Sequence, residues 1–378
     1  LNFTKNFVGV KLFRLEQNYR STQTIVGAAN SLIKKNVNQI PKNIYSQNGQ
    51  GDLIEIAGTY SDYLEGDFVA RKIMDLHSYK NCSYEDVVVL YRANSQSRII
   101  EETLRKNFIP YRVYGGLSFY QHKEIKDILA YCRLAINPND GEAFKRVLNY
   151  PTRGIGNVTL EKMLNASNDN NVSLWTVLND PISYGLNFNK GTYAKLQNFR
   201  ELIEELITDV RDKRVDEIGR KIVELTGFRN VLALEKEEEK VKNIDELLKG
   251  MQDFCRNRFE EGNENVGLVD YMAEVSLLTD QDLSDKENME KVTLMTVHAA
   301  KGLEFKSVFI VGLEEGLFPS EKCGESEAAI EEERRLFYVA ITRAENNCYI
   351  SYAENRSKYG SMEFARSSRF LDEIDEKK

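Results

Sequence analysis

The chain contains several short, continuously apolar runs that are rich in β-branched residues. Because both faces of such a run must be covered, the pattern predicts strands buried on both sides, as in a parallel sheet. Stretches with apolar residues at helical spacing lie between these runs, and this alternation indicates an α/β fold. The predicted strands are 53–57, 86–92, 292–298, 307–313 and 347–353, and the predicted helices between them are 22–35, 62–79, 95–107 and 331–345.

The middle of the chain, from about residue 119 to 285, has almost no strand signal. We therefore expect an all-α domain over 119–285, inserted into an α/β domain whose two parts are 1–118 and 286–378. The amphipathic segments of the inserted domain predict helices over 123–136, 141–149, 157–166, 193–211, 214–226, 239–259 and 266–278.

The amino-acid composition and the cysteine spacing indicate the class of protein and its cellular compartment. Hydrophobic content of 42% and charged content of 29% are typical of a soluble protein, and no apolar run reaches membrane-spanning length. The five cysteines are scattered and never in CxxC spacing, which favours reduced thiols and a cytoplasmic protein. The three histidines lie apart from the cysteines, so we expect no metal site. The first residue is Leu1 and not Met, so we expect a fragment or a processed product.

The net charge of −8 argues against a nucleic-acid partner, but the charges are unevenly distributed. Residues 92–126 hold seven basic and three acidic side chains, a surplus of four positive charges that leaves room for a basic groove. Residues 313–333 hold eight acidic residues and one lysine. We expect this acidic stretch to be a solvated loop.

The segment RRLFYVAITRAE, residues 334–345, is expected to form a helix with Leu336, Val339 and Ala340 on its inward face. Arg343 is the next position on that stripe. A guanidinium is always charged, so its burial is costly unless an anion meets it. Arg343 therefore either forms an ion pair with a carboxylate such as one of Glu331–Glu333, or points across an interface at a bound anion.

The segment LEQNYRST, residues 15–22, allows two interpretations. In the first, Ser21 or Thr22 caps the helix that follows, and Arg20 is a surface residue. In the second, the Tyr19 ring stacks on a base while Arg20 reaches a phosphate.

Two further segments also allow a structural and a functional interpretation. In TVHAAKGLEF, residues 296–305, a strand-to-helix turn can hold a ligand, whereas His298 can be structural and Lys301 and Glu304 can form a surface pair. In PTRGIG, residues 151–156, backbone N–H groups before a helix can meet a phosphate with help from Arg153. The glycines there can equally make a plain turn between helices.

In their order along the chain and in their amino-acid sequences, these segments closely resemble motifs of the UvrD/PcrA/Rep group of superfamily 1 DNA helicases. The resemblance covers nearly the whole chain. The matching segments are LEQNYRST, VVLYRANSQSR, YGGLSFYQHKEIKDILAYCRLAINP, RGIG, TVHAAKGLEF with GLEEGLFP, and EEERRLFYVAITRAE. Such helicases have two RecA-like motor domains, of which the first carries the phosphate loop and the magnesium-binding acidic motif. This sequence contains no GxxxxGK[ST] motif. The resemblance therefore implies the second motor domain (2A), a P-loop NTPase-like α/β fold that lacks the P-loop, with its helical insertion (2B).

The resemblance also implies a role for each matched residue. Arg343 would reach into the ATP site of the first motor domain and stabilise charge on the transferred phosphoryl group. Tyr19 would stack on adenine, Arg20 would contact the γ-phosphate, and Glu304 would bind the ribose. The implied DNA contacts are Arg92, Asn94 and His298 along the single strand, and Arg153, Gly154 and Gly156 at the duplex.

The resemblance implies a parent protein that is an ATP-dependent 3′–5′ DNA helicase of repair or replication. It would use ATP and Mg²⁺, contact single-stranded and duplex DNA, and work with the missing first motor domain and with loading proteins. The chain alone is expected to be inactive. Two alternatives stay open: a stand-alone nucleic-acid-binding module that kept the motor fold, and a relative whose motor drives a nuclease domain.

Overall fold

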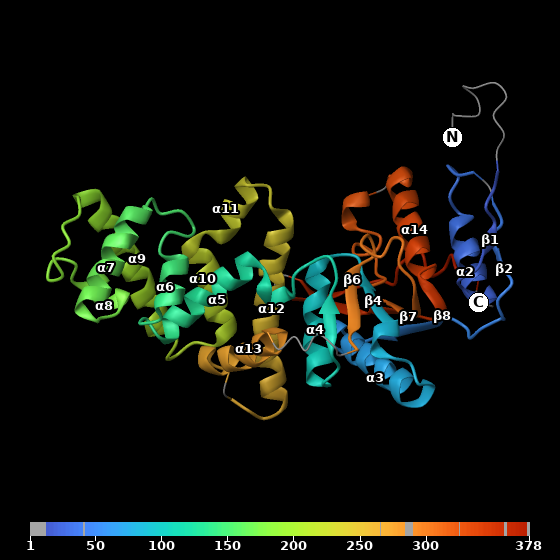
Figure 1. The fold of residues 1–378 in the computed structure, drawn as a ribbon, viewed down its shortest axis with the longest axis horizontal. Coiled ribbons are helices and arrows are strands. Elements are labelled where there is room, and N and C mark those ends of the chain that lie inside the picture. Colours follow the sequence, from blue (N-terminus) through green and yellow to red (C-terminus); the bar gives the residue numbers. More distant parts are fainter. Residues whose placement is uncertain are drawn as a thin grey trace, which may run out of the picture. The chain divides into compact units, whose positions relative to one another are not determined.

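The chain divides into two compact units in the computed structural model, which describes residues 13–40, 42–264, 266–283, 290–324, 326–358 and 361–375. The sheet unit comprises Leu1–Ser118 and Lys286–Lys378, and the helical unit comprises Phe119–Asp285, coloured from teal through green and yellow to orange in Figure 1. Each unit has its own hydrophobic core. No helix in the described ranges is both long and apolar enough to cross a lipid bilayer.

A six-stranded parallel sheet forms the centre of the sheet unit as far as the structure describes it. The strands lie in the order β3-β8-β7-β4-β6-β5, so β6 pairs between β4 and β5 although the helical unit separates it from both in the sequence. The two parts of the chain therefore build one sheet. The strands are β3 (Glu55–Thr59), β4 (Val87–Tyr91), β5 (Tyr111–Val113), β6 (Val292–Thr296), β7 (Phe305–Ile310) and β8 (Ala344–Ala353).

The parallel sheet with flanking helices is confirmed, and each predicted strand lies within a few residues of an observed one. Every residue of β4 is buried, as its apolar run predicts. β3 differs, because it is an edge strand whose residues alternate between half-buried and exposed. The pattern does not reveal β5, a three-residue strand with the exposed Arg112 at its centre. It also misses two small pairs, β1 (Gln17–Asn18) with β2 (Tyr45–Ser46) and β9 (Asn355–Lys358) with β10 (Ser361–Phe364).

Successive side chains of β4 enter two different cores on opposite faces of the sheet. Val88 and Leu90 pack into the core that includes α2 and α14. Val87 and Val89 pack into the core that includes α3 and α4. In Figure 1, α14 and α3 accordingly lie on opposite sides of the strands. These helices are α2 (Gln23–Ile33), α3 (Asp62–Lys80), α4 (Ser97–Lys106) and α14 (Glu327–Ile341).

Helix α14 differs from the predicted helix over 331–345, because it ends two residues before Arg343. Of the predicted inward stripe, Leu336 is half-buried and packs against the core that includes α2 and α14, whereas Val339 is half-buried and is not part of that core in the described chain. Ala340 is buried as predicted, and Phe337 takes the other inward position. Arg343 is therefore in the turn between α14 and β8 and does not continue a buried helical face.

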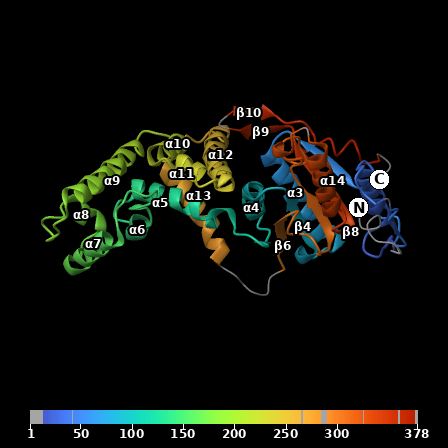
Figure 2. The same cartoon turned by 90° about the horizontal axis from the view of Figure 1, so that it is seen from above.

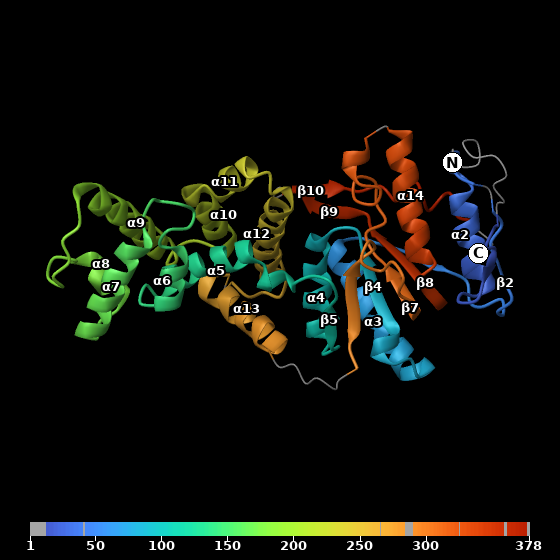
Figure 3. The same ribbon diagram turned by 45° about the horizontal axis from the view of Figure 1, so that its top comes forward.

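The described elements of the helical unit are helices around one core, in which Phe144 meets Phe199 and Tyr131 meets Phe228 edge to face. α7, α8 and α9 lie together at one end of the unit (Figure 2, Figure 3). The sequence pattern misses α8 and α11, which have six and seven residues. The helices are α5 (Lys123–Ile136), α6 (Gly141–Val147), α7 (Asn157–Asn170), α8 (Leu174–Asn179), α9 (Lys190–Asp209), α10 (Val215–Thr226), α11 (Phe228–Leu234), α12 (Glu238–Glu260) and α13 (Leu268–Leu283).

Candidate functional site

The predicted nucleotide contacts and single-strand contacts lie at opposite edges of the parallel sheet. Glu304 directly precedes β7 and Arg343 directly precedes β8, so both lie at the amino edge. Arg92 directly follows β4 and His298 follows β6 by two residues, so both lie at the carboxyl edge. Because the strands are parallel, each edge gathers residues from distant parts of the sequence.

At the amino edge, Arg20 joins three segments of the chain. Its Nε donates to Glu304 Oε2 at 2.6 Å, and its Nη1 donates to the carbonyl oxygen of Thr342 at 3.2 Å. The neighbouring Ser21 hydroxyl donates to the carbonyl oxygen of Ala344 at 2.6 Å, which fixes this segment against the start of β8. The structure therefore brings the predicted γ-phosphate and ribose contacts together, one residue from the predicted catalytic arginine.

Arg343 is held by neutral oxygen atoms within the part of the chain that the structure describes. Its Nε donates to the Val339 carbonyl at 3.0 Å, its Nη1 to the Leu303 carbonyl at 2.9 Å, and its Nη2 to Thr342 Oγ1 at 3.3 Å. Burial, together with the nearby Arg20 guanidinium, lowers the pKa of Arg343 from its ordinary value. A guanidinium has five N–H donors, so two remain available to an anion.

The alternative interpretation, an ion pair between Arg343 and one of Glu331–Glu333, is not what the structure shows. Glu331 and Glu332 both pair with Arg335, at 3.2 and 2.8 Å. Glu333 pairs with Arg92 at 2.8 Å. These three carboxylates are therefore engaged elsewhere, and none of them pairs with Arg343 in the described chain.

Tyr19 completes the amino edge. Its ring is 79% exposed, and its hydroxyl donates to Gln17 Oε1 at 2.9 Å. An exposed aromatic ring next in sequence to Arg20 can stack on a planar base while the guanidinium meets a phosphate.

Three local predictions at this edge need correction. Thr22 is the N-cap residue of α2, but its side chain makes no capping hydrogen bond, and the Ser21 hydroxyl is directed to β8 instead. Glu304 pairs with Arg20 and not with Lys301. The segment 297–304 forms turns and leads into β7, so the expected strand-to-helix turn is wrong.

At the carboxyl edge, Arg92 is fixed from two directions. Its Nε and Nη2 donate to the carboxylate oxygens of Glu333 at 2.8–3.1 Å. Gln96 Oε1 accepts the backbone N–H of Arg92 at 3.0 Å and so shapes the turn that contains Asn94. His298 lies nearby, and desolvation together with the Arg92 charge lowers its pKa from the ordinary value. The edge thus presents a held guanidinium, an amide and an imidazole.

The order in which the chain connects the strands reverses between β4 and β7, which creates a topological switch point at the carboxyl edge. β4 and β7 are neighbours, but β4 leads towards β5 on one side and β7 leads to β8 on the other. Crevices outside the carboxyl ends of strands at such switch points are common ligand sites in open α/β sheets. The turn after β7 packs closely here, because Gly312 has φ +72° and a Cβ would lie 2.3 Å from Gln96 Nε2.

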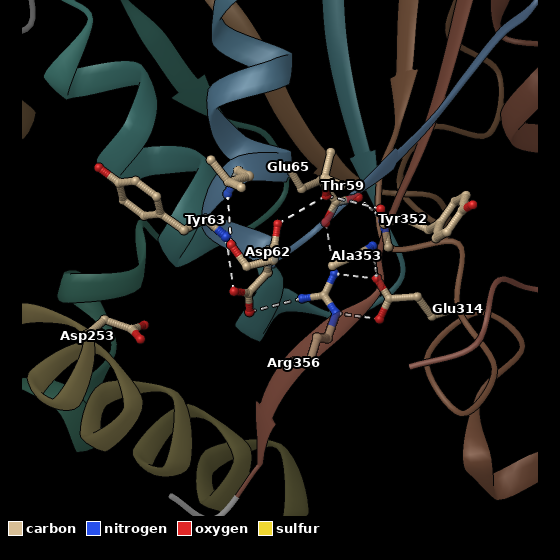
Figure 4. Close-up of polar contacts among 12 residues, drawn as sticks. Thr59, Asp62, Tyr63, Glu65, Asp253, Glu314, Tyr352, Ala353 and Arg356 are labelled. Atoms are coloured by element: carbon tan, nitrogen blue, oxygen red, sulfur yellow. Dashed lines mark hydrogen bonds and ion pairs between the residues drawn. The ribbon is translucent and has the colours of Figure 1, made fainter. Parts of the chain in front are cut away.

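Buried charges hold this turn in place (Figure 4). Arg356 donates from Nη2 to Glu65 Oε2 at 2.8 Å and to Glu314 Oε1 at 2.9 Å, and its Nη1 lies 3.5 Å from Asp62 Oδ2. Glu65 also accepts the Gly312 N–H at 2.8 Å. Burial raises the pKa of Glu65 despite the Arg356 charge. The cluster links α3, the turn after β7 and β9.

The acidic stretch 313–333 is therefore not the solvated loop that its composition predicts. Glu314 is 1% exposed and lies against Arg356, and Glu315 pairs with Arg369 at 2.6 Å. Arginines far along the sequence neutralise part of the negative charge.

The predicted duplex contacts lie between α6 and α7 in the helical unit. Arg153 turns inward, where its Nη1 donates to the Val147 carbonyl at 2.8 Å and its guanidinium lies 5.3 Å from the Phe199 ring centre. Gly154 has φ +70°, and Gly156 is the exposed N-cap residue of α7. The first backbone N–H groups of α7, and not the Arg153 guanidinium, are therefore placed to meet an anion.

Two residues that fix these contacts were not predicted in these roles: Glu333 was considered only as a partner of Arg343, and Gln96 was not considered. Helical spacing offered a signal for Glu333, because it lies one turn before the buried Phe337. Gln96 acts locally, because its Oε1 accepts the backbone N–H groups of Arg92 and Ala93 at the start of the same short helical turn. No three His, Cys, Asp or Glu side chains gather as metal ligands within the described ranges.

Comparison with known proteins agrees with this arrangement. The family model for the UvrD-like helicase C-terminal domain matches residues 13–355. The ATP-dependent DNA helicase PcrA of Bacillus subtilis (strain 168) is 42% identical over 99% of this chain and 51% of its own length. PcrA of Staphylococcus aureus (strain MRSA252) is 40% identical over 100% of this chain and 51% of its own length. The chain spans about half the length of the curated relatives it matches, and it belongs to the UvrD-like helicase C-terminal domain family.

Proposed function

We propose that this chain is the second motor domain (2A) and its inserted domain (2B) of an ATP-dependent DNA helicase that moves 3′ to 5′ in repair or replication. The amino edge carries the proposal. There Arg20 and Arg343 lie together without a carboxylate on Arg343, and the sequence has no phosphate loop. Such an edge fits a nucleotide whose phosphates are held by another domain. The parent protein is accordingly this chain joined to a preceding first motor domain, in the cytoplasm.

In the proposed cycle, ATP and Mg²⁺ are held mainly by the first motor domain. The two remaining N–H donors of Arg343 stabilise the charge on the transferred γ-phosphoryl group. Arg20 contacts the γ-phosphate, Tyr19 stacks on adenine and Glu304 accepts a hydrogen bond from the ribose. ATP then draws the two motor domains together, and hydrolysis releases them.

The DNA contacts are proposed at two separate places. The single strand follows the carboxyl edge along Arg92, Asn94 and His298. The duplex meets the turn of Gly154 and Gly156, with Arg153 supporting that turn and loading proteins as further partners. Contacts of these kinds grip phosphates and do not read base sequence, which suits a motor that must move along any DNA.

Strand separation by the parent protein tests this proposal. With ATP and Mg²⁺, a partial duplex with a 3′ single-stranded tail is expected to release its labelled strand, and a matched duplex with a 5′ tail is not. Release can be followed by fluorescence. Separation of the 5′-tailed duplex alone would overturn the direction, and separation of neither would favour a nucleic-acid-binding module.

A further inference from the structure

Glu333 is a buried carboxylate on the helix that connects the two edges of the sheet. Its side chain is 8% exposed, against 25% for its partner Arg92. Both carboxylate oxygens bond the Nε and Nη2 side of the guanidinium, and Oε2 also accepts the Ser320 N–H at 3.3 Å. The geometry is the two-pronged form of the arginine–carboxylate pair, which fixes direction as well as distance.

This pairing leaves the other side of the Arg92 guanidinium unused. Within the described part of the chain, Nη1 makes no hydrogen bond, and the side chain reaches solvent at the carboxyl edge. Because Glu333 occupies one side, the unused N–H groups can point in only one direction. That direction is available to a DNA phosphate, so the carboxylate acts as a support for the proposed contact.

The same helix ends at the proposed nucleotide site. Glu333 lies eight residues before Ile341, the last residue of α14, which corresponds to about 12 Å along the helix, and Arg343 follows in the next turn. Arg343 is bound to this helix, since its Nε donates to the carbonyl oxygen of Val339 in the last turn. A displacement of α14 that follows a change at Arg343 therefore also moves Glu333.

We propose that Glu333 is a positioning residue through which a nucleotide bound at Arg343 changes the grip of Arg92 on single-stranded DNA. This inference rests on the proposed function. The coupling is reciprocal, so the factor by which nucleotide changes DNA affinity equals the factor by which DNA changes nucleotide affinity.

The test uses the parent protein with Glu333→Gln and a fluorescent oligothymidylate. The dissociation constant for DNA is measured by anisotropy with and without a non-hydrolysable ATP analogue and Mg²⁺. The ratio of the two constants is expected to differ from one by about fivefold or more in the unchanged protein. In Glu333→Gln it is expected to fall to within about twofold of one, because an amide cannot hold the guanidinium on two oxygens.

Glu332→Gln is the matched control, because it removes the same charge from the adjacent position. Its side chain is 75% exposed and pairs with Arg335, so the ratio should be unchanged. If the only effect of Glu333→Gln were to remove repulsion between the carboxylate and DNA phosphates, DNA binding would strengthen equally with and without nucleotide. The ratio of the two dissociation constants would then be unchanged. If Glu333→Gln does not fold, Glu333→Asp keeps the charge but shortens the side chain, and the same fall is expected.

The outcomes separate the two proposals. A ratio of one in the unchanged protein, together with no DNA-stimulated ATP hydrolysis, overturns the proposed function and this inference with it. A ratio far from one in the unchanged protein that persists in Glu333→Gln overturns this inference alone.

Discussion

Replacing Arg343 by alanine in the parent protein is expected to lower DNA-stimulated ATP turnover about a thousandfold. The guanidinium keeps two N–H donors free of protein partners in the described structure, and its other three are fixed on Val339, Leu303 and Thr342. A donor held in this way stabilises charge as it develops on the phosphoryl group, without having to reorganise. Because this interaction acts on the transition state, ATP and single-strand binding should change little.

Steady-state hydrolysis with saturating single-stranded DNA measures this effect, and nucleotide binding is checked in parallel. Arg335→Ala is the matched control, because Arg335 is on the same helix but its guanidinium is held by Glu331, Glu332 and the Asn38 carbonyl, none of which is a proposed nucleotide contact. Its turnover should stay within about twofold of the unchanged protein. Unchanged turnover in Arg343→Ala would mean that the guanidinium only ties α14 to the Leu303 carbonyl.

Replacing Arg356 by alanine is expected to lower the free energy of unfolding by about 3–5 kcal/mol. The substitution leaves Glu65 and Glu314 buried with no cation in the described part of the chain, although their backbone donors remain. Buried charges without a partner are the costly case, whereas an exposed pair is worth less than about 1 kcal/mol. Arg369→Ala is therefore the control, since its pair with Glu315 is more exposed, at 52% and 28% of the two side chains.

The loss in Arg356→Ala should also depend on pH. The pKa of Glu65 is already raised above its ordinary 4.5 by burial, and removal of the arginine raises it further. Over the range between the unfolded and folded pKa values, the folded state binds more protons, so stability falls as pH rises. Urea denaturation of the variant should therefore show a smaller loss at pH 5 than at pH 8. An equal loss at both pH values would show that the carboxylates do not carry the effect.

The strand pattern and the motif sequences predicted the parallel sheet well, because both signals depend on residues close together in the sequence. The inward face of α14 was predicted less well. The pattern placed the helix over 331–345, whereas capping by Ser326 starts it at Glu327 and it ends at Ile341. Its buried face runs through Ile330, Phe337, Ala340 and Ile341, and Leu336 packs half-buried beside that face. Apolar residues lie on two adjacent faces of this helix, so their spacing alone does not show which face is buried.

Charge counts along the sequence predicted the surface less reliably. The surplus of basic residues in 92–126 does not form a continuous exposed basic surface. Arg98, for example, is 1% exposed and pairs with Glu102 at 2.9 Å. Arg92 likewise pairs with a residue 241 positions away. Ion pairs between distant segments depend on the fold, so no window of sequence could reveal which charges remain available.

In the proposed function, this chain supplies Arg343 and Arg20 to a nucleotide whose phosphates and magnesium are held by another domain. Hydrolysis of ATP by residues 1–378 alone, compared with the parent protein, tests that division of labour. We expect no magnesium-dependent turnover above background by the chain alone, with or without single-stranded DNA. We expect robust DNA-stimulated turnover by the parent protein. Substantial turnover by the pure chain would contradict the proposed function, because the phosphate-binding groups would then lie within these 378 residues.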